Sequence, residues 1–174
     1  IISLMPERIL LEEIHLRAGD NDLHGSIMYR LAADHNGRAK ISGQLRSSYL
    51  NVNELSPPPE RKFLFSAEPL PVRWAKTHDV DVGFEVARFL RRNYDLRSLT
   101  GKVSSENGAV DGNSNSSAFG GNLALRLILD TRSTPYRAKY QYDWEGLNLA
   151  LLPAARKVDR EITGQVNLKG GITG

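Results

Sequence analysis

The carboxylates that could act as acids or bases fall into two close pairs. Asp20/Asp22 and Asp79/Asp81 are each spaced i, i+2, which places both side chains of a pair on one face of a strand. Glycoside hydrolysis needs two carboxylates that flank the scissile bond, and no further acid or base accompanies either pair. Neither a phosphate-binding glycine loop nor a nucleophile elbow occurs in the sequence. These patterns predict that the protein is not an enzyme.

Residues that could bind a metal are dispersed along the chain. There is no cysteine, and the histidines lie at polar positions without the spacing of metal ligands: His15, His24, His35 and His78. Asp111–Asn115 begins like a calcium-binding loop, but Ser116 and Asn122 replace the turn glycine and the bidentate glutamate. We therefore expect solvated histidines, a polar hairpin or loop at Asp111–Asn115, and no metal or cofactor.

Composition and charge exclude further classes of protein. The 40% hydrophobic content argues against disorder throughout, and no apolar run is long enough for a membrane-spanning helix. The 23 basic and 20 acidic residues give a net charge of +3, without the dense basic stripe typical of nucleic-acid binding. We expect no nucleic-acid partner. Because the sequence opens at Ile1 with no signal peptide, we also expect a piece of a longer protein.

Alternation of apolar and polar residues is the dominant pattern, and it predicts β-strands with one dry face. Regular alternation of this kind is typical of antiparallel sheets. Asn36–Gly37 and Asn107–Gly108 predict hairpin turns, so consecutive strands should pair as a meander. The residues expected on the dry face are Leu16, Ile27, Tyr29, Leu31, Ile41, Leu45, Val82, Phe84, Val86, Leu123, Leu125, Leu127, Leu129, Tyr136, Tyr140, Tyr142, Trp144, Ile162, Val166 and Leu168.

Helix is scarce, and prolines divide the sequence. One or two short helical turns are predicted at Val72–Thr77 and Leu147–Arg156. Residues 56–71 are rich in proline, which cannot donate to a strand ladder, and they form a predicted connector. We therefore expect a first β segment at residues 1–55 and a second at 72–174 that continues the same sheet.

A short pattern recurs along the chain: aliphatic, hydroxyl, glycine, long polar, aliphatic. It occurs at Ile41–Leu45, Leu99–Val103 and Ile162–Val166, and more loosely at Leu23–Ile27, which indicates a repeating unit. Its glycines fall on the dry face, where glycine usually marks sharp curvature or a close approach. The predicted curvature glycines are Gly25, Gly43, Gly101 and Gly164.

The predicted sheet has one long apolar face and little helix to cover it. Such a face must pack on a second sheet, close into a barrel, or curl around something apolar. Glycines on the dry face favour curling, so we expect an all-β fold, mostly an antiparallel meander curled into an open groove. A groove with this lining suits acyl chains, since each buried CH₂ contributes about 0.8 kcal/mol.

Several segments, in this order, resemble the AsmA-like family of bridge-like lipid transfer proteins (AsmA/TamB-type). The resemblance implies a periplasmic protein of a diderm bacterium, with an inner-membrane anchor outside this sequence. It also implies a β-groove that carries phospholipids towards the outer membrane and has no catalytic residues. The segments that carry it are Asp22–Gly25, Ile41–Leu55, Phe119–Leu123, Leu147–Leu152, Ile162–Leu168 and Gly171–Gly174.

The expected function is therefore one segment of a lipid conduit that supports outer-membrane biogenesis, with phospholipids as the partner. Two alternatives stay open. The first is an assembly scaffold for outer-membrane proteins, in which an exposed sheet edge templates a client strand. The second is a closed β-sandwich with a structural or adhesive role.

Overall fold

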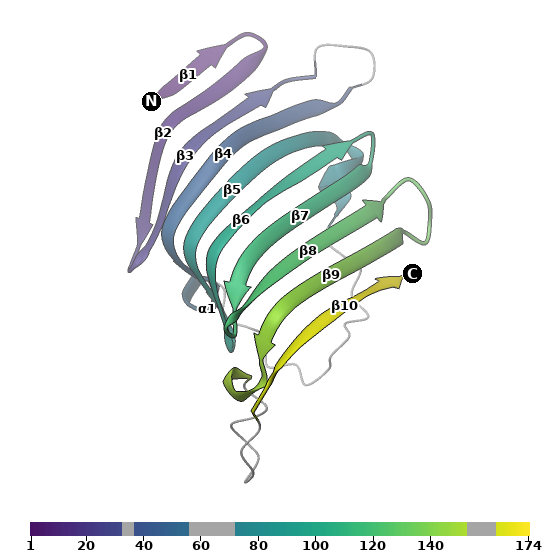
Figure 1. The fold of residues 1–174 in the computed structure, drawn as a ribbon. Helices are drawn as coiled ribbons and strands as arrows, with labels where there is room; N and C mark the ends of the chain where they lie inside the picture. The colour runs from purple at the N-terminus through teal and green to yellow at the C-terminus, as the bar shows by residue number, and fades with distance from the viewer. Residues whose placement is uncertain (33–36, 56–71, 153–162) are drawn as a thin grey trace.

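A computed structural model describes residues 1–32, 37–55, 72–152 and 163–174. They form one ten-stranded sheet in which the spatial order of the strands equals their order in the sequence (Figure 1). The strands are β1 (Ile2–Met5), β2 (Arg8–Ala18), β3 (Asn21–Arg30), β4 (Ala39–Asn51), β5 (His78–Arg91), β6 (Tyr94–Glu106), β7 (Ala109–Ala118), β8 (Gly121–Asp130), β9 (Arg137–Asn148) and β10 (Gln165–Thr173).

The predicted all-β, mostly antiparallel architecture is confirmed, and the sheet is open, with β1 and β10 as its two edges. Every neighbouring pair is antiparallel except β4 and β5, which are parallel. The meander is therefore interrupted at this one connection, where the sequence predicted a connector in place of a short turn. Parallel neighbours need a long crossover, and here the chain returns from the end of β4 to the start of β5, passing helix α1 (Val52–Leu55) and the 3₁₀ turn η1 (Arg73–Lys76).

The crossover gives the sheet two distinct ends. The α1 end carries α1, the turns before β6 and β8, and the 3₁₀ turn η2 (Leu149–Leu151). The η1 end carries η1, the Asn107–Gly108 turn and the start of β9. Asn107 and Gly108 have φ angles of 49° and 82°, the left-handed pair of a tight hairpin turn, so this predicted turn is confirmed.

The register places one apolar face across the whole sheet. Cα partners run in an unbroken row from edge to edge: Ile2, Leu11, Ile27, Gly43, Val82, Val103, Gly112, Leu127, Tyr140 and Ile172. A parallel row nearer the η1 end contains Leu4, Ile9, Tyr29, Ile41, Val80, Ser105, Val110, Leu129 and Ala138. A third row contains Ile14, Gly25, Leu45, Phe84, Gly101, Ser114, Leu125, Tyr142 and Gly170.

The opposite face is polar and carries cross-strand ion pairs. Side chains there lie directly opposite or diagonal to partners of the other sign, where such pairs support the register of a sheet. The pairs are Arg46–Glu85 at 3.3 Å, Asp81–Lys102 at 2.6 Å, Asp111–Arg126 at 2.6 Å and Asp143–Lys169 at 2.7 Å. A one-residue slip of any strand would exchange the two faces, so this pattern fixes the register.

Bulges bend the strands and interrupt the simple alternation of residues between the two faces. In β2 the register shifts between Leu11 and Ile14, with Glu13 at φ 51°. Leu11 and Ile14 therefore share the apolar face, whereas Leu10 pairs with Met28 on the polar face. A second shift lies in β6 at Ser98, where φ is 50°. Bulges increase local twist and bend a strand, and Figure 1 shows the strands curving together.

The glycines of the apolar face permit close approach. Gly25 has a φ of 148°, a region that side-chain-bearing residues rarely adopt. A Cβ on Gly101 would overlap the Phe84 ring, and one on Gly170 would lie 2.6 Å from the Tyr142 hydroxyl. Aromatic rings thus cover glycines on neighbouring strands. Gly164, by contrast, precedes β10 and lies outside the rows, with a φ of 134°.

One local prediction is wrong, and another is confirmed only in part. The Asp111–Asn115 segment, expected as a hairpin or loop, lies inside β7. The ladders to β6 and β8 pair its backbone on both sides, which overrides its weak strand propensity. The helical turns predicted at Leu147–Arg156 reduce to η2, because Leu147 and Asn148 still pair with β10; residues 153–156 lie outside the described residues. The turn predicted at Val72–Thr77 is confirmed as η1.

Candidate functional site

The candidate site is the apolar face itself. Its three rows contain no charged residue, and most of their side chains are only partly buried. Of the row residues away from the edge strands, Leu127 and Tyr140 are 39% and 37% exposed. The described residues form a single sheet, and among them no second sheet lies over this face.

The rows bring together most of the residues that the sequence predicted for the dry face. Ile27, Tyr29, Ile41, Leu45, Val82, Phe84, Leu125, Leu127, Leu129, Tyr140 and Tyr142 lie in the three rows. Further towards the α1 end, pairing aligns Leu16 with Leu23, Val86 with Leu99, Leu123 with Trp144 and Leu168, and Val166 with Leu147.

Two predicted residues lie outside the rows, and a third is not described. Leu31 follows β3 and is exposed. Tyr136 precedes β9 and packs against η1, with the Lys76 ammonium 5.2 Å from its ring centroid. Ile162 lies outside the described residues. The rows therefore end before Leu31 and Tyr136, because both residues fall beyond the strands that carry the alternation.

The η1 end of the apolar face is covered by protein. Ala75 of η1 is fully buried against Val110 and Leu129, and Trp74 packs beside them. Leu129 is 1% exposed, although Leu127, two residues earlier on the same face, is 39% exposed. Since the two leucines share one strand and one face, the difference in their exposure shows that η1 covers Leu129 but does not reach over Leu127.

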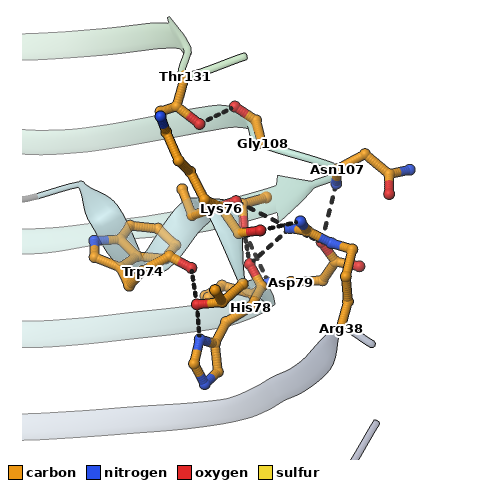
Figure 2. A network of polar contacts seen from close by, with 12 residues as sticks. Arg38, Trp74, Lys76, His78, Asp79, Asn107, Gly108 and Thr131 are labelled. Atoms are coloured by element: carbon orange, nitrogen blue, oxygen red, sulfur yellow. Dashed lines mark hydrogen bonds and ion pairs between the residues drawn. The ribbon is translucent and has the colours of Figure 1, made fainter. Parts of the chain in front are cut away.

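A partly buried ion-pair network holds η1 in place (Figure 2). The Arg38 guanidinium donates to Asp79 at 2.7 Å and to the carbonyl oxygens of Lys76 and Ala75 at 2.6 and 2.9 Å. The Asn107 amide also donates to Asp79, at 3.0 Å. The Arg38 hydrogen bonds and the Asn107 amide hold the pKa of the Asp79 carboxyl below its usual value. The network joins the starts of β4 and β5 to the β6–β7 turn.

The α1 end of the same face is aromatic. The ring of Phe119 lies 6.1 Å from Tyr94 and 5.8 Å from Trp144. Nearer the middle of the face, Tyr140 lies 6.3 Å from Tyr142. Burial raises the pKa of Tyr140, and the neighbouring phenols of Tyr142 and Tyr94 raise it further. Tyr94 belongs to β6 and Tyr140 to β9, so the strands β7 and β8 lie between them. The Phe119 ring contacts both Tyr94 of β6 and Trp144 of β9, which indicates that the sheet curves around the apolar face and that this face is the concave one.

A cavity of about 880 Å³ opens beside this aromatic group, where β6 and β7 stop pairing at Arg97 and Ser117. Its lining combines polar and apolar groups, among them Asn93, Arg97, Ser117, Phe119, Asn122 and Leu151. Sequence reasoning missed this site because Phe119 lies in a turn, with a φ of 48°, where no alternation indicates which face a side chain joins.

Two of the described histidines lie side by side. His15 and His24 are cross-strand partners with Nδ1 atoms 2.8 Å apart, and His24 Nε2 lies 3.0 Å from Asp22. The Tyr49 and Ser48 backbone amides donate to Asp22 and hold its pKa far below the usual value. Among the described residues no group of three or more potential ligands gathers.

Comparison with known proteins adds no relative. No family model matches this chain, and neither a curated protein nor a solved structure matches it. Across the described ranges no helix has both the length and the apolar character needed to cross a membrane.

Proposed function

We propose that this chain is a segment of a lipid conduit, in which acyl chains lie on the concave apolar face and headgroups stay at its rim. The observation that carries the proposal is the charge-free row that runs from Ile2 to Ile172 across every strand of the sheet. Over the described residues, η1 covers this face at one end only. Soluble proteins rarely leave an apolar surface of such extent uncovered unless it binds a partner.

The energetics favour an acyl chain over water on this face. Covering apolar surface contributes about 25 cal/mol per Å², and about 0.8 kcal/mol for each CH₂ of the ligand. Aliphatic side chains with no fixed polar partner impose no register on the ligand. A chain could therefore move along the rows without breaking a hydrogen bond, which suits passive transport.

In this proposal the chain belongs to an AsmA-like protein of the periplasm, anchored in the inner membrane outside this sequence. It would carry phospholipids between the inner and outer membranes and so support outer-membrane biogenesis. The single open sheet with a concave apolar face supports this setting, as do the sequence segments that resemble the family.

One observation favours the alternative of strand templating. In the described part of the chain, β10 pairs with β9 alone, so one backbone edge of its nine residues is open. An open edge of this length can accept a further strand. The other alternative, a closed sandwich, is not formed by the described residues, because they contribute one sheet and not two.

The proposal is tested with two neighbouring variants of β9. Tyr140→Glu places a charge on the apolar face, and Gln141→Glu places the same charge on the polar face. We expect native mass spectrometry to show phospholipid adducts on the unaltered chain and on Gln141→Glu, but not on Tyr140→Glu, with unchanged far-UV circular dichroism. Absence of adducts on the unaltered chain, or equal adducts on both variants, would contradict the proposal.

A further inference from the structure

The two ends of the apolar face differ in chemistry, and this difference can orient a lipid. At the η1 end the face is aliphatic and closed, with Val110, Leu129 and Ala75 nearly inaccessible to water. At the α1 end it carries aromatic residues with polar groups. The Tyr94 hydroxyl at this end has no hydrogen-bond partner within the described ranges, and Tyr94 is 53% exposed. Tyrosine and tryptophan suit sites where an apolar region meets a wet one.

The cavity beside these rings contains an unpaired cation. Arg97 is exposed and has no ion-pair partner among residues that the structure describes. The carboxylate in the same cavity, Asp95, is already neutralised by Arg88 at 2.9 Å. Arg97 can therefore offer its full charge to an anion. Asn93 and Asn122 line the cavity as well and add amide donors. Arginine with neighbouring amide donors is well suited to phosphate.

The cavity and the aromatic group are continuous. Phe119 lines the cavity, and its ring also contacts Trp144 on the apolar face. From Trp144 back to Ala138, which packs beside η1, β9 spans about 20 Å at roughly 3.3 Å per residue. The hydrocarbon of one membrane leaflet is about 15 Å thick, half of a roughly 30 Å core. An acyl chain therefore fits between the two ends.

We propose that the α1 end is the headgroup site for a glycerophospholipid, with the phosphate at Arg97, the glycerol esters beside Tyr94 and Trp144, and the acyl chains directed towards η1. This inference rests on the proposed function and adds an orientation to it. The Tyr94 hydroxyl donates to an ester carbonyl oxygen, which only accepts hydrogen bonds. The closed end receives the methyl ends of the chains, because the Ala75, Val110 and Leu129 side chains that meet there offer a phosphate no hydrogen bond in place of the water it would lose.

The chain's two tryptophans, Trp74 in η1 and Trp144 in β9, report this orientation separately. Trp74→Phe leaves Trp144 as the only indole, and Trp144→Phe leaves Trp74. Each variant is mixed with phosphatidylglycerol brominated either near the ester or near the methyl end of its acyl chains. We expect ester-end bromine to quench Trp144 more strongly and methyl-end bromine to quench Trp74 more strongly.

The outcomes separate this inference from the proposed function. No quenching of either indole by either lipid would overturn both. Equal quenching by the two lipids, or the reversed pattern, would overturn the orientation and leave lipid binding intact.

The phosphate contact is tested with Arg97→Ala, with Arg137→Ala as the control, an exposed arginine of β9 at the η1 end. We expect Arg97→Ala to weaken binding of phosphatidylglycerol about tenfold, in line with loss of a charge-assisted hydrogen bond. Arg137→Ala should leave binding unchanged. Equal effects of both variants would refute the Arg97 contact. Displacement of the lipid by inorganic phosphate at equal concentration would assign the cavity to the free anion instead.

Discussion

Truncation of two leucines in β8 tests whether the apolar face is free or covered. Leu129 and Leu127 point to the same side and are two residues apart, but they are 1% and 39% exposed. Leu129→Ala removes a side chain packed against Val110 and Ala75. Buried leucine-to-alanine changes cost 2–5 kcal/mol, because a cavity adds to the lost transfer energy. We therefore expect a loss of about 3 kcal/mol in the free energy of unfolding.

Leu127→Ala should cost much less. Full burial of a leucine side chain contributes about 1.5–3 kcal/mol, and about two fifths of Leu127 is already exposed. Solvent can also fill the space, so no cavity term applies, and we expect a loss of about 1 kcal/mol. Phospholipid binding should respond in the opposite order, with Leu127→Ala weakening it and Leu129→Ala leaving it nearly unchanged.

Urea unfolding followed by circular dichroism measures the stability of the two variants, and quenching of tryptophan fluorescence by brominated lipid measures their phospholipid binding. The reasoning is refuted if both variants lose the same stability. That result would mean that protein covers Leu127 as fully as Leu129, and the apolar face would then be an ordinary core.

The remaining predictions concern the features that shape the groove. Asp79→Asn should lower stability by about 2 kcal/mol at neutral pH, since it removes the anion that Arg38 and the Asn107 amide surround. Because the folded pKa of Asp79 is depressed, its contribution is present above the unfolded pKa of about 3.9 and is lost as the pH falls through the folded value. The free energies of unfolding of the two proteins, measured by urea titration from pH 7 downwards, should therefore converge. A difference that stays constant with pH would argue against the pairing of Asp79 with Arg38. Gly101→Ala should destabilise by about 1–3 kcal/mol through overlap with Phe84. Gly112→Ala, whose Cβ meets no atom closer than 4.0 Å, should be tolerated in the same thermal assay, and equal losses would show that close approach is not what Gly101 provides.

The aromatic residues of the apolar face could be predicted from the sequence only in part. Tyr140, Tyr142 and Trp144 alternate with polar residues, so their common face follows from the strand period of two. Phe119 and Tyr94 come from a turn and from the start of another strand. Their contact with Trp144 depends on the curvature of the sheet, which no local pattern contains.

The sequence by itself determined the all-β class, the Asn107–Gly108 turn and the side of the sheet on which most apolar residues lie. These features are local, since alternation and turn geometry involve residues close along the chain. Tertiary structure alone decided the parallel pairing of β4 with β5, the bulges at Glu13 and Ser98, and the cover of one end of the face by η1. Each of these depends on contacts between distant segments, and the energy of such contacts overrides the propensity of any single stretch.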